Sequence, residues 1–87
     1  MKGGSKLSGI ETKAIVEINQ TAARYKSSIV MQAHNKNIDV KSILGLSMTL
    51  MNDEVYQLEI HGPDEAEAKK AMADVFRKHG LSCGIKA

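Results

Sequence analysis

Residues 56–80, YQLEIHGPDEAEAKKAMADVFRKHG, carry the strongest structural signal in this chain. Tyr56, Leu58 and Ile60 alternate with polar residues, which predicts a strand with one buried side and one side in water. A Gly-Pro pair then ends the strand, and Asp64 belongs to the residue types that commonly cap the start of a helix. The stretch therefore predicts a half-buried strand followed directly by a helix.

The predicted helix after this strand has clear signals at both ends. Acidic residues occupy its first turn and basic residues its last, as the helix dipole favours. Gly80 suits the left-handed backbone that ends many helices, and Leu81 is then expected to pack back on Phe76. The residues expected to face the core are Ala68, Ala71, Met72 and Val75.

A second helix is predicted upstream, over residues 12–26. Its start is either Thr12 or, through a capping box, Ser8. Apolar side chains recur at steps of three and four and define its buried face, at Ile15, Ile18, Ala22 and Tyr25. Basic side chains fall in its expected last turn, at Arg24 and Lys26.

The middle of the chain predicts a hairpin and a short helix. Strand-like segments at 29–32 and 38–40 flank the turn residues 35–37, where Asn tolerates left-handed backbone. Ser42 is a typical cap for a short apolar helix that runs to Leu50.

These elements predict one α+β domain over residues 1–87, an open-faced sandwich in which three helices cover one face of an antiparallel sheet. Residues 1–8 contain two glycines and leave open an edge strand or a disordered segment. Because this first strand is weak or truncated, the strand 56–60 is expected to leave backbone groups unpaired. Such an edge predicts a homodimer, by edge-to-edge addition or by exchange of the N-terminal segment.

The composition excludes several classes of function. The 87 residues include no Trp, 12 basic against 10 acidic residues and a net charge of +2, too small to indicate nucleic-acid binding. Cys83, the one cysteine, excludes an internal disulfide and fits a reducing compartment, so we expect a cytoplasmic protein without a membrane span. There is no metal-ligand spacing, catalytic triad or phosphate-binding glycine loop, so we expect no enzyme, no metal and no cofactor.

Three segments resemble motifs of one known family. Gly9–Ala14 with Gln20–Ala22, then Lys41–Leu46, then Gly62–Ala68 are similar in order and spacing to the HPr phosphocarriers of the sugar phosphotransferase system. The resemblance covers about residues 9–82. It implies the open-faced sandwich fold and a histidine, at the start of the first helix, that takes phosphate from enzyme I and passes it to sugar permease components. In many Gram-positive relatives a dedicated kinase also phosphorylates a serine at the start of the second helix, and this form binds a catabolite-control transcription factor.

The match places Glu11 where the family has the histidine. Lys13 replaces the family's arginine and Ala14 its proline. A carboxylate lacks the imidazole nitrogen, so the carrier site is expected to be degenerate, with no catalytic residue. The other histidines are not expected to replace it, because each falls elsewhere in the fold: His34, His61 and His79.

The matched regulatory serine is Ser42, and apolar neighbours are expected to form a docking patch around it, at Ile43, Leu44 and Leu46. Ser47 stands where the family has a second apolar residue, which weakens the expected contact with the transcription factor. Three functions stay open: a regulatory relative without the carrier histidine, similar to catabolite-repression HPr-like proteins; a phosphocarrier with an unorthodox or inactive site; and a structural module in which Ser42 only caps a helix.

Overall fold

The computed structural model describes residues 6–7, 10–33, 35–49 and 55–86. The elements follow one another as β1 (Lys6–Leu7), β2 (Ile10–Glu11), α1 (Thr12–Ala23), β3 (Ser28–Ala33), β4 (Lys36–Asp39), α2 (Ile43–Thr49), β5 (Val55–His61), α3 (Glu65–Lys78) and β6 (Ser82–Ile85). The predicted α+β class is confirmed. No helix in these described ranges has the length and apolar character needed to cross a membrane.

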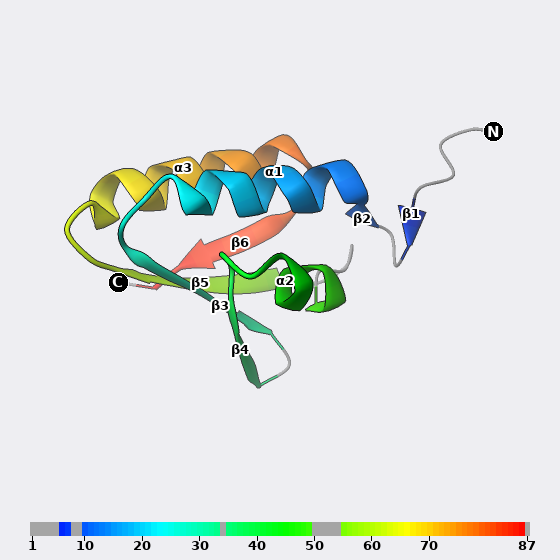
Figure 1. Cartoon of the computed structure of the whole chain (residues 1–87), viewed down its shortest axis with the longest axis horizontal. Helices are drawn as coiled ribbons and strands as arrows, with labels where there is room; N and C mark the ends of the chain where they lie inside the picture. Colours follow the sequence, from blue (N-terminus) through cyan, green and yellow to red (C-terminus); the bar gives the residue numbers. More distant parts are fainter. Residues whose placement is uncertain (1–5, 8–9, 34, 50–54, 87) are drawn as a thin grey trace.

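The main sheet has four strands in the order β4-β3-β5-β6, and β1 pairs with β2 in a separate two-stranded sheet. Strand β3 is antiparallel to both β4 and β5. Figure 1 shows α1 and α3 lying side by side over one face of the main sheet. Helix α2 packs against α1 and the edge strand β4. The opposite face carries no helix among the elements drawn with labels, as the open-faced sandwich requires.

The position of the last strand, β6, shows that two predictions are wrong. Strand β6 runs parallel to β5, with Tyr56 beside Cys83 and Leu58 beside Ile85, so the sheet is not wholly antiparallel. The prediction of an open edge at residues 56–60 is also wrong, because β6 pairs with β5 along that side. The Lys86 N–H extends this ladder by donating to the Leu58 carbonyl at 2.8 Å.

The core confirms the predicted apolar faces of β5 and α3. Tyr56, Leu58 and Ile60 are buried on the helix side of the sheet, and the rings of Tyr56 and Phe76 meet edge to face at 6.2 Å. Further fully buried residues come from α1, β3, α2 and α3, at Ile18, Ala22, Met31, Leu46, Ala68 and Met72. Predicted core residues at Ile15, Tyr25 and Ala71 are only half-buried.

The predicted end of α3 is confirmed. Gly80 has a φ of +72° and donates its N–H to the Arg77 carbonyl, while the Leu81 N–H donates to the Phe76 carbonyl at 2.9 Å. This pair of bonds defines a Schellman ending, which buries Leu81 against the core.

Helix α1 begins at Thr12, the first residue of the predicted range, and ends three residues earlier than predicted, at Ala23. Thr12 is its first helical residue rather than its cap, and the alternative cap Ser8 lies outside the described residues. The helix ends at Ala23, because the N–H groups of Arg24 and Tyr25 bond three residues back and tighten the chain into a turn. Arg24 and Lys26 therefore follow the helix instead of filling its last turn.

Candidate functional site

The segment that the sequence motifs predict to correspond to the family's carrier site lies where β2 meets α1. The backbone of Glu11 ends β2, in register with Lys6, and α1 begins at the next residue. Lys13 is exposed in the first turn, whereas Ala14 is buried and belongs to the core. The backbone thus brings Glu11 to the start of α1, as expected, and a carboxylate there is favoured by the helix dipole.

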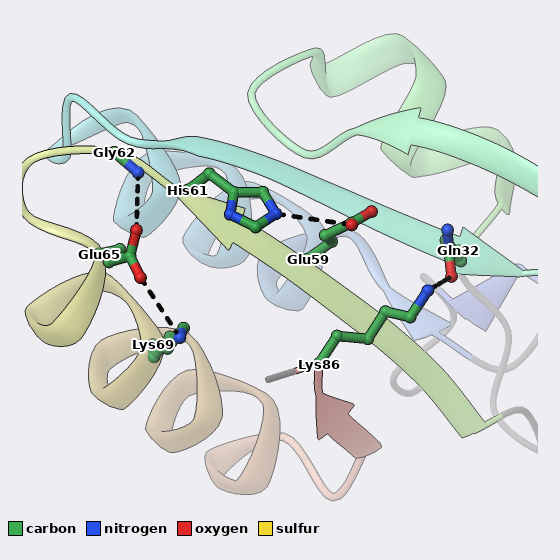
Figure 2. Close-up of polar contacts among 7 residues, drawn as sticks. All are labelled: Gln32, Glu59, His61, Gly62, Glu65, Lys69 and Lys86. Atoms are coloured by element: carbon green, nitrogen blue, oxygen red, sulfur yellow. Dashed lines mark hydrogen bonds and ion pairs between the residues drawn. The ribbon is translucent and has the colours of Figure 1, made fainter.

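Neither described histidine reaches the start of α1. His61 lies exposed on the open face of β5, where its Nε2 is 3.5 Å from Glu59 Oε2 (Figure 2). His79 directly follows α3, and its Nε2 lies 2.8 Å from Glu17 Oε1, in the middle of α1. His34 lies outside the described residues.

The contact with Glu17 gives His79 a structural role. The other Glu17 oxygen, Oε2, accepts a hydrogen bond from Lys78 Nζ at 2.7 Å, so one carboxylate ties α1 to the end of α3. The Lys78 ammonium, followed by His79, holds the pKa of Glu17 below its ordinary value. An ionised carboxylate that already binds both side chains makes this cluster a clamp between helices.

Ser42 caps α2 and is exposed to solvent. Its Oγ accepts the Gly45 N–H at 3.4 Å, and its carbonyl accepts the Leu46 N–H at 3.0 Å. The first of these bonds is long, so it holds the hydroxyl only weakly.

The loop that carries Ser42 is fixed to α1 and to the turn that follows it by two bonds over long sequence separations. Asn19 Nδ2 donates to the Val40 carbonyl at 3.1 Å, and Lys41 Nζ donates to the Tyr25 carbonyl at 2.7 Å. Asp39 adds a local bond by accepting the Lys41 N–H at 3.0 Å. Sequence reasoning noted Lys41 only as part of a motif, and nothing in the sequence indicated the part played by Asn19.

Two apolar side chains next to Ser42 are exposed, Ile43 at 44% and Leu44 at 68%. Together with Ser42 they form what we call the Ser42 surface. The prediction for Leu46 is wrong, because its side chain is fully buried in the core and offers nothing to a partner. In the part of the chain that the structure describes, the other large apolar residues with comparable exposure are Val16 and Val55.

Fold and motifs together define an HPr-like open-faced sandwich, and comparisons with known proteins agree. The family model described as "PTS HPr component phosphorylation site" matches residues 5–78. The phosphocarrier proteins HPr of Neisseria meningitidis serogroups A and B are each 35% identical over 69 residues, which cover 78% of this chain and 78% of theirs. The chain therefore belongs to the HPr family of the phosphotransferase system.

Solved structures of the same fold include two dimers. The HPr dimer from Thermoanaerobacter tengcongensis has a TM-score of 0.73 at 30% identity, over 90% of this chain and 95% of that one. Crh, the catabolite repression containing protein of Bacillus subtilis, crystallised as a dimer with a swapping domain. It has a TM-score of 0.72 at 26% identity, over 91% of this chain and 93% of that one.

Proposed function

We propose that this chain is a regulatory member of the HPr family that carries no phosphoryl group on a histidine. It acts in the cytoplasm by binding other proteins, and phosphorylation of Ser42 is its switch. One observation carries the proposal: the first histidine of the chain is His34, so none precedes or begins α1. Glu11 stands immediately before that helix instead.

The chemistry of Glu11 argues against a phosphate relay. A histidine carrier attacks the phosphoryl donor with a neutral ring nitrogen, whereas a carboxylate offers only a charged oxygen. Its negative charge repels the incoming phosphoryl group, and the product would be an acyl phosphate rather than a phosphohistidine.

The Ser42 surface supports a switch by its exposure, on a loop that the bonds of Asn19 and Lys41 hold in place. The hydroxyl is open to solvent and only weakly engaged by the Gly45 N–H, so a kinase has access to it. A phosphate there adds about −1.5 to −2 charges beside the exposed side chains of Ile43 and Leu44, which changes what the surface binds. The proposed partners are the family's serine kinase and either the catabolite-control transcription factor or phosphotransferase components.

The experiment is incubation with HPr serine kinase and ATP, followed by intact mass measurement. We expect one phosphate on the wild-type chain, none on Ser42→Ala and one on Ser47→Ala. Ser47 is a matched control because it lies exposed on α2, the helix that Ser42 caps, where its Oγ donates to the Leu44 carbonyl at 3.0 Å. An unmodified wild-type chain, or a phosphate that persists on Ser42→Ala, would contradict the proposal.

A further inference from the structure

Strand β6 forms one edge of the main sheet, with β5 on its inner side. The Lys86 N–H points toward β5, since it donates to the Leu58 carbonyl. Backbone groups along a strand alternate in direction, so Ser82 and Gly84 also face β5. Cys83 and Ile85 therefore direct their N–H and C=O groups away from the sheet.

The two edge strands of this sheet, β4 and β6, differ in how well they are protected against pairing with a further strand. Strand β4 at the other edge carries Lys36 and Asp39, and charged residues on an edge discourage pairing with another strand. The β6 residues, Ser-Cys-Gly-Ile, include no charge and no proline. The side chains of Cys83 and Ile85 are turned toward the core, where they pack half-buried, so they do not screen the outward groups.

We propose that β6 pairs antiparallel with β6 of a second copy of this chain, about a two-fold axis at Gly84. In this register Cys83 lies opposite the partner's Ile85, and Ile85 lies opposite the partner's Cys83. Residues in such a hydrogen-bonded pair exchange both of their bonds, so both N–H and both C=O groups of each strand are satisfied. The result is one continuous sheet across two copies.

Other bonds in the structure favour this register. An axis at Cys83 would place Ile85 opposite the partner's Leu81, whose N–H is already bonded to the Phe76 carbonyl at 2.9 Å. The axis at Gly84 also sets Lys86 opposite the partner's Ser82, so no like charges face each other.

A second copy fits this edge better than a longer foreign strand does. Two residues of β6 point outward, so a longer peptide gains no further bonds from it. The two-fold register uses all of those outward groups in both copies. Because few bonds form, we expect association in the millimolar range of chain concentration rather than an obligate dimer.

Amide exchange measured by NMR as a function of concentration tests this pairing. Exchange at Cys83 and Ile85 should slow about tenfold once nine-tenths of the chains are paired, because only the unpaired form exchanges. The outward amides of Asn37 and Asp39 on β4 should keep their rates. Slowing at β4, or no slowing at β6 in a chain that dimerises, would overturn the proposal.

Variants at the two edges supply the matched control. Ile85→Pro removes an outward N–H without touching the bonds to β5, and Asn37→Pro removes an outward N–H from the other edge. In sedimentation equilibrium at millimolar concentration, we expect Ile85→Pro to stay monomeric and Asn37→Pro to dimerise like the wild type. A monomeric wild type, or an Ile85→Pro variant that dimerises equally well, would overturn the proposal.

The single cysteine gives a readout that needs no substitution. The two Cys83 residues would be diagonal neighbours about 7–8 Å apart, a separation that a short bifunctional thiol reagent bridges. A direct disulfide is not expected at that separation. A cross-linked dimer that forms only at high chain concentration supports the register, and its absence argues against it.

Discussion

One oxygen of Asp64 holds Ser27 through two hydrogen bonds. Oδ1 accepts the Ser27 N–H at 2.9 Å and the Ser27 hydroxyl at 2.5 Å, and Oδ2 accepts the Lys26 N–H at 2.9 Å. Ser27 is fully buried, so these bonds satisfy polar groups whose burial would otherwise be costly. They join the turn between α1 and β3 to the start of α3.

This arrangement predicts a dependence of stability on acid. The Ser27 hydroxyl, followed by the Lys26 N–H, holds the pKa of Asp64 below its ordinary value. A lowered pKa in the folded chain means that the ionised form stabilises the fold. The contribution is complete above the ordinary pKa of aspartate and is lost as the pH falls through the lowered value.

Asp64→Asn should therefore lower the free energy of unfolding at neutral pH and flatten its decline toward about pH 2. Urea unfolding over this pH range measures both effects. Asp74→Asn is the control, because Asp74 is exposed and forms only a 3.7 Å surface pair with Arg77. Parallel pH profiles for Asp64→Asn and the wild type would contradict this role.

Gly62 lies against the same serine, and this contact predicts an unusually costly substitution. A Cβ at Gly62 would lie 2.6 Å from the Ser27 Cα, and the φ of +153° already disfavours other residues. Gly80→Ala is the matched control, since Gly80 has a φ of +72° with no atom within 4 Å of an added Cβ. We expect a loss of about 1–2 kcal/mol for Gly80→Ala and a clearly larger loss for Gly62→Ala, measured by denaturant unfolding. Equal losses would show that the contact with Ser27 gives way.

The sequence predicted the elements whose signals are local. Alternation at Tyr56, Leu58 and Ile60 identified β5, and Gly80 marked the end of α3. It did not predict β6, because four residues with an internal glycine have little strand propensity, and only their position beside β5 makes them a strand. Asp64 was expected to cap α3, yet its carboxylate instead bonds a residue 37 positions away, which no local pattern reveals.

The sequence also predicted only part of the candidate site. Motif matching selected Ser42 and its apolar neighbours, but seven residues of helix are too few for periodicity to decide which of them are buried. Leu46 is buried and Leu44 exposed, because α2 packs against α1 and β4 along one side.

The burial of Leu46 and the exposure of Leu44 predict different effects when each leucine is replaced by alanine. Leu46→Ala should cost about 2–5 kcal/mol of stability, because it opens a cavity in the core. Leu44→Ala should change stability by no more than about 0.5 kcal/mol, while weakening the binding of a partner to the Ser42 surface. Chemical denaturation and titration with a purified phosphotransferase component measure the two effects. Similar stability losses for both variants would contradict the assignment.

The bond from Lys41 to the Tyr25 carbonyl predicts how firmly the Ser42 loop is held. Lys41→Met keeps much of the side chain's bulk but removes this bond, and should cost about 1 kcal/mol. It should also speed amide exchange in the first turn of α2. Lys36→Met, at an exposed position on β4, is expected to do neither. Unchanged exchange in α2 after Lys41→Met would show that the loop is held by other contacts.

The central claim is that no phosphoryl relay runs through this molecule. Incubation with enzyme I and radiolabelled phosphoenolpyruvate tests it most directly, with a histidine-containing HPr as the positive control. We predict no acid-labile, base-stable label on this chain and no onward transfer to a permease component. Label recovered on a histidine nitrogen, and then passed to such a component, would contradict the claim.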